Sequence, residues 1–148
     1  MVVINGVHWI ANLRGNDQTL LGSTFVTLKT HVSELDKLSP AQDQEFVVIR
    51  NALIRAMRVS FQPLTINTSC LKNNAFKIAP DDTPPGAAHV HWHFKPRYGT
   101  KPMIINDEVF NDPLPGNYLS SFERRTTSKE TSRLIAATLR GNLPEMRT

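Results

Sequence analysis

Apolar residues are concentrated early in the chain in two short runs, residues 7–14 and 22–29, which a polar cluster separates. Both runs are rich in β-branched and aromatic residues, and the cluster between them contains Gly, Asn and Asp. Turn residues between two runs of this kind are typical of antiparallel pairing. The pattern therefore predicts two antiparallel strands near the N-terminus.

A helical pattern begins after Ser39. This serine is suited to the N-cap, Pro40 to the first helical position, and Gln42 to the reciprocal contact of a capping box. The apolar positions that follow recur at helical spacing: Phe46, Ile49, Leu53, Ala56, Met57 and Phe61. We expect a long helix from Pro40 to Ser60, ended by Pro63.

The next runs are shorter and more ambiguous. Residues 64–72 predict a third strand, and residues 88–94 predict a fourth, which Pro96 should stop. Between them, residues 74–86 contain three prolines, two aspartates and a glycine, which predicts an irregular loop.

The C-terminal third combines an irregular stretch with a helix. Residues 99–126 are rich in Pro, Gly and Asn, and we expect an irregular excursion there. A helix is expected over 127–141, because Thr127 and Glu130 have the spacing of a capping box and Gly141 suits the C-terminal end. The whole chain, 1–148, is thus predicted to form one α+β domain with a mostly antiparallel sheet.

The composition is that of an ordinary globular protein. Of the 148 residues, 40% are hydrophobic and 20% are charged, which is normal for one domain. No apolar stretch approaches the ~20 residues of a membrane span, so no membrane partner is expected. The N-terminus has no signal-peptide pattern, and the single cysteine, Cys70, fits a reducing compartment. We expect a cytoplasmic protein.

The net charge of +4 favours anionic ligands. The basic residues are dispersed, however, and Arg124-Arg125 is the only adjacent pair. The sequence has neither an arginine-rich arm nor the Cys/His spacing of a zinc finger, so nucleic acid is not an expected partner.

Three of the five histidines alternate in one segment, at His89, His91 and His93. Successive side chains of a strand point to opposite faces, so the three imidazoles are expected on one face. The apolar residues between and after them should pack into the core behind that face: Val90, Trp92 and Phe94.

The residues alone leave three interpretations of this segment open. The histidines could be a chance feature of a solvated strand. They could bind Zn²⁺ or Fe²⁺, with Asp81, Asp82 or His31 as a further ligand. Alternatively, one histidine could be a nucleophile that its neighbours orient.

The segment resembles the signature of the histidine triad (HIT) superfamily, His-φ-His-φ-His-φ-φ, where φ is apolar. The resemblance extends to flanking segments and covers residues 8–98, whereas the chain from residue 99 onward matches only loosely. The flanking segments that carry it are 21–26 (LGSTFV), 29–35 (KTHVSEL), 38–40 (LSP), 70–74 (CLKNN) and 95–98 (KPRY). The resemblance implies a HIT-like fold, with a sheet of about five antiparallel strands, one long helix and a C-terminal helix.

The resemblance also implies roles for the histidines. The middle histidine, His91, would attack the α-phosphate of a nucleotide, with its other ring nitrogen donating to a backbone carbonyl. His93 would donate to a non-bridging α-phosphate oxygen or orient His91, and His89 would support the site.

Substrate-binding residues carry over from the family in the same way. Asn73, or its neighbour Asn74, corresponds to an amide side chain near the α-phosphate. Asn12 corresponds to a first-strand asparagine that shapes the nucleoside pocket, and His31 is expected to approach the site.

The sequence departs from the family in two places. Many members have Gly-Gln-Ser/Thr before the first histidine, where this chain has residues 84–88, PPGAA, without a hydroxyl or amide side chain. The backbone amide of Gly86 is a substitute donor there, and the group that protonates the leaving group is left unassigned. The final apolar position of the signature is occupied by Lys95.

The function that the resemblance implies is hydrolysis of dinucleoside polyphosphates, such as diadenosine tri- or tetraphosphate, through a covalent nucleotidyl-histidine. The alternatives are a nucleoside phosphoramidase or nucleotidyl transferase, and a nucleotide-binding regulatory protein with weak activity. No cofactor or resident metal is expected for the covalent step, although a divalent metal could accompany the nucleotide. Family members commonly pair through the long helix and an adjoining strand, so a homodimer is expected.

Overall fold

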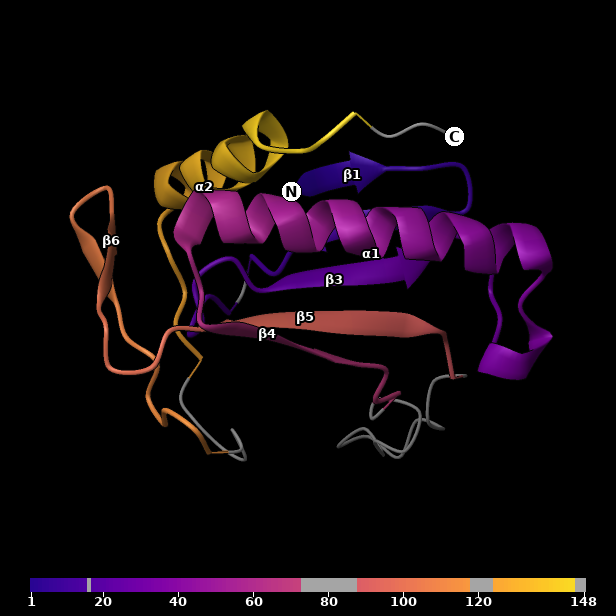
Figure 1. The fold of residues 1–148 in the computed structure, drawn as a ribbon, viewed down its shortest axis with the longest axis horizontal. Helices are drawn as coiled ribbons and strands as arrows, with labels where there is room; N and C mark the ends of the chain where they lie inside the picture. Colours follow the sequence, from indigo (N-terminus) through magenta and orange to yellow (C-terminus); the bar gives the residue numbers. More distant parts are fainter. Residues whose placement is uncertain (16, 73–87, 118–123, 146–148) are drawn as a thin grey trace, which may run out of the picture.

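The central element of the fold is a five-stranded sheet in which every neighbouring pair of strands is antiparallel. We describe a computed structural model, which covers residues 1–15, 17–72, 88–117 and 124–145. In sheet order the strands are β1 (Val2–Asn5), β2 (Trp9–Leu13), β3 (Thr24–Leu28), β5 (His91–Arg97) and β4 (Thr65–Ser69). Figure 1 shows the long helix α1 (Pro40–Phe61) in front of this sheet, running along the direction of the strands. The α+β fold with a mostly antiparallel sheet is as expected.

The predicted pairing of the two early runs is confirmed. β2 and β3 pair in an unbroken antiparallel register, in which Ala11 lies opposite Val26. β1 was not expected: its four residues are too short a run to stand out, and it joins the sheet edge beside β2.

Helix α1 (Pro40–Phe61) forms as predicted and follows a short 3₁₀ turn, η1 (Leu35–Lys37). The Ser39 hydroxyl accepts from the Gln42 amide at 3.3 Å, and the Gln42 side chain accepts from the Ser39 amide at 2.8 Å. This capping box satisfies two of the donors that a helix start leaves open. The helix ends at Phe61, and its C-cap Gln62 adopts the left-handed conformation with φ 50°.

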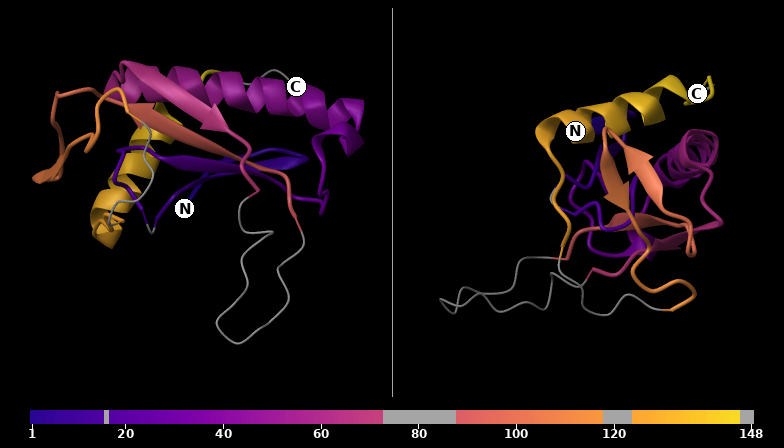
Figure 2. Two further views of the ribbon diagram at one scale, coloured as in Figure 1. Left: turned by 90° about the horizontal axis from the view of Figure 1, so that it is seen from below. Right: turned by 90° about the vertical axis from the view of Figure 1, so that its left-hand side faces the viewer.

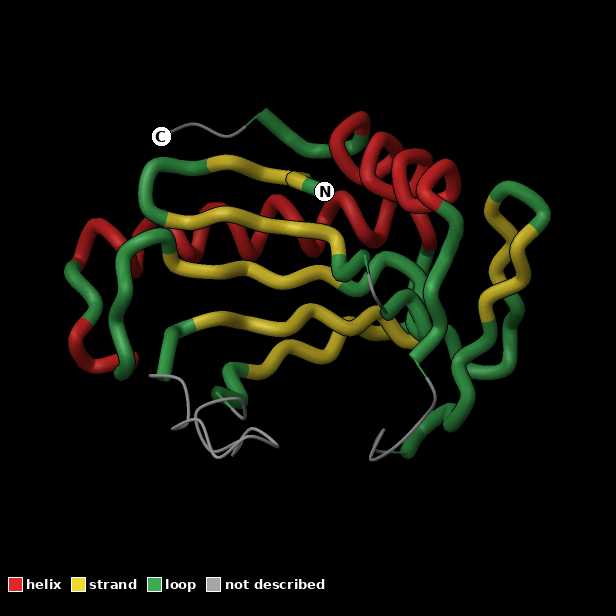
Figure 3. Tube along the Cα trace, turned by 180° about the vertical axis from the view of Figure 1, so that it is seen from behind, coloured by secondary structure: helices red, strands yellow, loops and turns green. Residues whose placement is uncertain are grey.

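One face of the sheet packs against α1. The rings of Trp9 and Trp92 each lie 5.0 Å, between centroids, from Phe46 of the helix. The strand residues that share this face with Trp9 and Trp92 are buried, including Ala11, Leu13, Val26, Leu28 and Phe94. Figure 2 shows α1 on this side of the sheet, and Figure 3 shows the opposite face with the strands in front of the helix. We call the side against α1 the closed face and the opposite side the open face.

The bounds of β5 differ from the predicted ones at both ends. The strand begins at His91, after the expected start at residue 88, and it passes through Pro96 to Arg97. Proline is tolerated where its missing N–H faces no neighbouring strand. In the described residues the register between β3 and β5 extends only as far as Phe94, so Pro96 has a partner strand on one side.

The segment expected to be irregular contains a β-hairpin. Strands β6 (Met103–Ile105) and β7 (Glu108–Phe110) pair antiparallel around Asn106 and Asp107. Both turn residues have positive φ, 51° and 60°, which is the geometry of a tight type I′ turn. Figure 1 shows this hairpin standing apart from the main sheet.

Helix α2 (Lys129–Gly141) confirms the predicted C-terminal helix but not its caps. Its N-cap is Ser128, whose hydroxyl accepts from the Thr131 amide at 3.0 Å, so the expected box of Thr127 and Glu130 is wrong. Gly141 is the last helical residue, and Asn142 is the C-cap. The helix packs against α1, β1 and β6. Neither α1 nor α2 combines the length and apolar character that crossing a membrane requires.

Candidate active site

Strand β5 presents two of the predicted histidines, His91 and His93, on the open face. The register with β3 places His91 opposite Thr27 and His93 opposite Phe25. The two imidazole centroids are 5.1 Å apart. The Phe25 ring lies edge-on to both, 6.0 Å from His91 and 4.7 Å from His93. Phe25 of β3 thus contacts both histidine rings, a role that was not visible in the sequence.

The orientation of His91 is fixed by its own backbone. Its Nδ1 lies 2.9 Å from the carbonyl oxygen of His89, which can act only as an acceptor. In the neutral ring, Nδ1 therefore carries the proton and Nε2 has the lone pair. This is the backbone contact that the resemblance implied for a nucleophilic histidine.

His93 is held in its neutral form. Burial, with smaller contributions from the nearby His91, Lys95 and Arg14, lowers its pKa from 6.5 to about 4. Its Nδ1 is buried and has no hydrogen-bond partner among the described residues. A buried ring nitrogen without a partner is costly unless a ligand or water satisfies it.

His89 lies before β5 rather than within it, so the three histidines do not occupy one strand as expected. Its Nε2 contacts the carbonyl oxygen of Leu28 at 2.6 Å, which holds the ring at the end of β3. Its Nδ1 lies 3.3 Å from Nδ1 of His31, and the two rings meet edge-on with centroids 5.1 Å apart. His31 therefore reaches the site by contacting His89.

The β2 side of the open face carries Asn12 and Arg14. Asn12 lies opposite Phe25 in the register. The Arg14 guanidinium lies 5.1 Å above the Phe25 ring and pairs with Asp17 at 3.2 Å. Its Nε is buried without a hydrogen-bond partner in the described part of the chain. Sequence reasoning named Asn12 but missed Arg14, because nothing in the turn that follows β2 distinguishes a site arginine from a solvated one.

Three predicted binding residues, Asn73, Asn74 and Gly86, lie outside the described residues, as do Asp81 and Asp82. Among residues 1–15, 17–72, 88–117 and 124–145, no group of three or more His, Cys, Asp and Glu side chains is arranged to hold a metal ion.

Trp92 and Phe94 were expected to pack in the core. Phe94 is completely buried, and the half-buried Trp92 stacks on Phe46 of α1. Both residues therefore lie on the closed face, away from the histidines.

Comparison with known proteins identifies the fold. No protein-family model and no curated protein sequence matches the chain. Among solved structures, a histidine triad protein from Sinorhizobium meliloti matches with a TM-score of 0.73 at 15% identity, over 97% of this chain and 89% of that one. A zinc-bound histidine triad family protein from Mycobacterium smegmatis matches with a TM-score of 0.58 at 21% identity, over 93% and 82%. The diadenosine triphosphate hydrolase of Plasmodium falciparum, in complex with cyclomarin A, matches with a TM-score of 0.58 at 15% identity, over 95% and 74%.

The chain therefore has the histidine triad fold, and the implied fold is confirmed. His91 and His93 lie on the open face of its sheet.

Proposed function

We propose that the chain is a nucleotide hydrolase of the histidine triad family, which cleaves dinucleoside polyphosphates at the α-phosphate. The observation that carries the proposal is the bond from His91 Nδ1 to the His89 carbonyl, which leaves Nε2 free to act as a nucleophile. The Plasmodium diadenosine triphosphate hydrolase, with the same fold, supports this choice of substrate class.

In the proposed reaction, the Nε2 lone pair of His91 attacks the α-phosphorus. The bond from phosphorus to the bridging oxygen breaks, and that oxygen leaves with the electron pair and the distal phosphates. Water then attacks the nucleotidyl-histidine, loses a proton to solvent, and releases a nucleoside monophosphate and free His91.

The neighbouring groups stabilise the charge that grows on the phosphoryl oxygens. His93 is neutral at pH 7, and a neutral imidazole has one N–H, which it can donate to a non-bridging oxygen. Its Nδ1, which has no hydrogen-bond partner among the described residues, supports a ligand contact on this ring. His89 holds His91 through its backbone carbonyl, and its own ring is held by Leu28 and His31. Gly86 with Asn73 or Asn74 is proposed to complete the phosphate contacts.

The nucleoside is proposed to bind on the β2 side, over Phe25 and beside Asn12. The aromatic edge and the amide offer an apolar surface with a polar group beside it, which is the usual make-up of a nucleoside pocket. Arg14, whose buried Nε has no hydrogen-bond partner in the described part of the chain, lies at the boundary between this region and the histidines.

We further propose that the protein is a cytoplasmic homodimer that pairs through α1 and the adjoining strand β4. β4 is the last strand in the order of the described sheet. Helix α1 exposes Val47, Val48 and Val59 at 42%, 37% and 64% of their surface. The β4 edge that no other described strand covers and the exposed apolar residues of α1 are surfaces that a second copy can cover. The covalent step needs no cofactor, and a divalent metal enters only with the nucleotide.

The function is tested by turnover of diadenosine tetraphosphate. We expect His91→Ala to reduce kcat by about 10³-fold or more, because no other group supplies the covalent step. His8→Ala, a histidine outside the site, is the matched control and should keep full activity. Unchanged turnover in His91→Ala would exclude the nucleophile assignment. Tight binding without turnover by the unaltered protein would instead favour a regulatory nucleotide-binding protein.

A further inference from the structure

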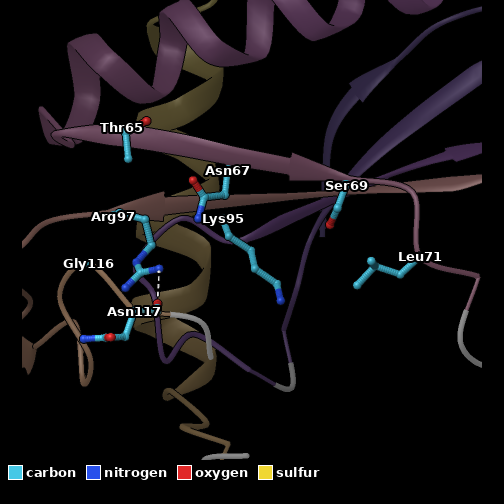
Figure 4. A pocket seen from close by; sticks show the side chains of 8 residues that line it. All are labelled: Thr65, Asn67, Ser69, Leu71, Lys95, Arg97, Gly116 and Asn117. Atoms are coloured by element: carbon cyan, nitrogen blue, oxygen red, sulfur yellow. Dashed lines mark hydrogen bonds between the residues drawn. The ribbon is translucent and has the colours of Figure 1, made fainter. Parts of the chain in front are cut away.

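A cavity of about 440 Å³ opens on the same face of the sheet as the histidines, farther along β5. It is lined by open-face residues of β4 and β5, by Leu71 just after β4, and by a turn that follows the hairpin (Figure 4). The lining residues are Thr65, Asn67, Ser69, Leu71, Lys95, Arg97, Gly116 and Asn117. The size is within the range of small-molecule binding pockets. None of the residues named above for the reaction or for nucleoside binding lines this cavity.

The residues that line the cavity adjoin the histidines along β5 and across the register of β4. On β5, residues two apart share a face, so Lys95 follows His93 on the open face at a Cα spacing of about 7 Å. The register of β4 places Ser69 opposite His93 and Asn67 opposite Lys95. A chain of phosphates that leaves the α-phosphate at His91 and crosses His93 would therefore meet Ser69, Asn67 and Lys95.

Arg97, the second cation in the cavity wall, is neutralised by its partners. Its Nε and Nη2 donate to the two carboxylate oxygens of Asp112 at 2.7 and 3.0 Å, and both residues are buried. Nη1 donates to the carbonyl of Asn117 at 3.0 Å, and Nη2 also donates to that of Leu114. Arg97 thus anchors the turn that closes the cavity, as the dashed bond in Figure 4 shows.

Lys95 is the cation that these contacts leave for a ligand. Its ammonium makes no hydrogen bond or ion pair with another described residue, although the side chain is half-buried. Burial, followed by the charge of Arg14, lowers its pKa from the ordinary value. A bound anion would offset that cost. Lys95 also occupies the position where the histidine triad signature has an apolar residue, so this cation belongs to the chain and not to the general pattern.

We propose that the cavity is a subsite for the phosphates of the leaving group, with Lys95 Nζ binding a phosphate beyond the α-phosphate and Ser69 and Asn67 donating beside it. The inference rests on the proposed function and narrows it. The preferred substrates are nucleotides whose leaving group is a phosphate chain, and nucleoside phosphoramidates, whose leaving amine carries no phosphate, do not use this subsite. As the P–O bond breaks, the departing oxygen takes the electron pair, and the Lys95 charge stabilises the released phosphate.

The test compares two substrates that share the adenosyl α-phosphate, diadenosine tetraphosphate and adenosine 5′-phosphoramidate. Loss of one charged phosphate contact is worth about 1.5–3 kcal/mol. We therefore expect Lys95→Met to reduce kcat/KM for the tetraphosphate by about 10- to 100-fold. The same variant should stay within about twofold of the unaltered protein on the phosphoramidate. Lys95→Arg keeps the charge and should restore most of the tetraphosphate activity.

Two controls separate the subsite from folding and from net charge. Lys101→Met removes an exposed lysine outside the cavity and should leave both substrates unaffected. Thermal unfolding of Lys95→Met should match that of the unaltered protein. An equal loss on both substrates, or no loss on the tetraphosphate, would overturn the subsite while leaving the hydrolase proposal intact.

A binding measurement distinguishes failure of the hydrolase proposal from failure of the subsite. Calorimetry with inorganic tripolyphosphate should detect binding to the unaltered protein that Lys95→Met weakens at least tenfold. If the unaltered protein hydrolysed neither substrate and still showed this binding, the hydrolase proposal would fall and the anion subsite would stand. Tripolyphosphate binding that does not depend on Lys95 would contradict the subsite.

Discussion

The two faces of the five-stranded sheet are built from alternate residues of the same strands, yet they hold opposite kinds of side chain. On the closed face, Val26 and Phe94 are completely buried against the helix layer. On the open face, the neighbouring residues Phe25, His93 and Lys95 are half-buried. The rings of Phe25 and His93 contact each other, and Lys95 lines the cavity. The comparison shows how one strand can specify packing and chemistry at once, because the strand period of two keeps the two sets apart.

The largest expected difference between the faces is in stability. Phe94→Ala should reduce the free energy of unfolding by about 3–5 kcal/mol, since it leaves a cavity in the core. Phe25→Ala, on the open face of the adjacent strand β3, should cost clearly less and should instead impair turnover by disturbing His91 and His93. Urea unfolding of both variants makes the comparison. Equal destabilisation would show that the open face is also a packing surface.

Arg97 is the exception on the open face, because it is buried and structural. Arg97→Met should cost about 3 kcal/mol, since it leaves the Asp112 carboxylate buried without its partner. The double variant Arg97→Met/Asp112→Leu should recover much of that loss. A double variant as unstable as the single one would mean that Arg97 acts chiefly through its contacts with the 114–117 turn.

A smaller difference is expected in the pH dependence of stability. The pKa of His93 is about 4 in the folded protein and 6.5 in its ordinary state. Between these values the unfolded chain binds a proton that the folded chain does not, so stability falls as the pH drops from about 6.5 toward 4. The stability lost between pH 7 and pH 5 in urea unfolding should be smaller for His93→Gln. The control His8→Gln should keep the full loss of stability between pH 7 and pH 5. An unchanged pH dependence of stability in His93→Gln would contradict the lowered pKa of His93.

The parts of the fold that local sequence specifies were predictable. The capping box of Ser39 and Gln42 and the helical spacing behind it located α1, and the turn cluster after residue 14 located the pairing of β2 with β3. The hairpin β6–β7 was missed, although its signal, Asn106-Asp107 between two short apolar runs, was present.

The site was predictable only where one segment carries it. His91 and His93 followed from the alternation of one strand, whereas Phe25 joins them through a register between strands distant in the sequence. The same holds for Ser69 and Asn67, which face β5 from β4. Lys95 was visible as a departure from the family signature. Its cavity was not, because one wall is a turn about 20 residues later in the chain, which Arg97 holds in place.

The measurement that tests the account most directly is capture of the covalent intermediate. The protein is incubated with diadenosine tetraphosphate, quenched, digested without acid, and examined by mass spectrometry. We expect an acid-labile adenylyl group on His91 that is absent from His91→Ala. Turnover without any adduct on His91, or an adduct on another residue, would contradict it.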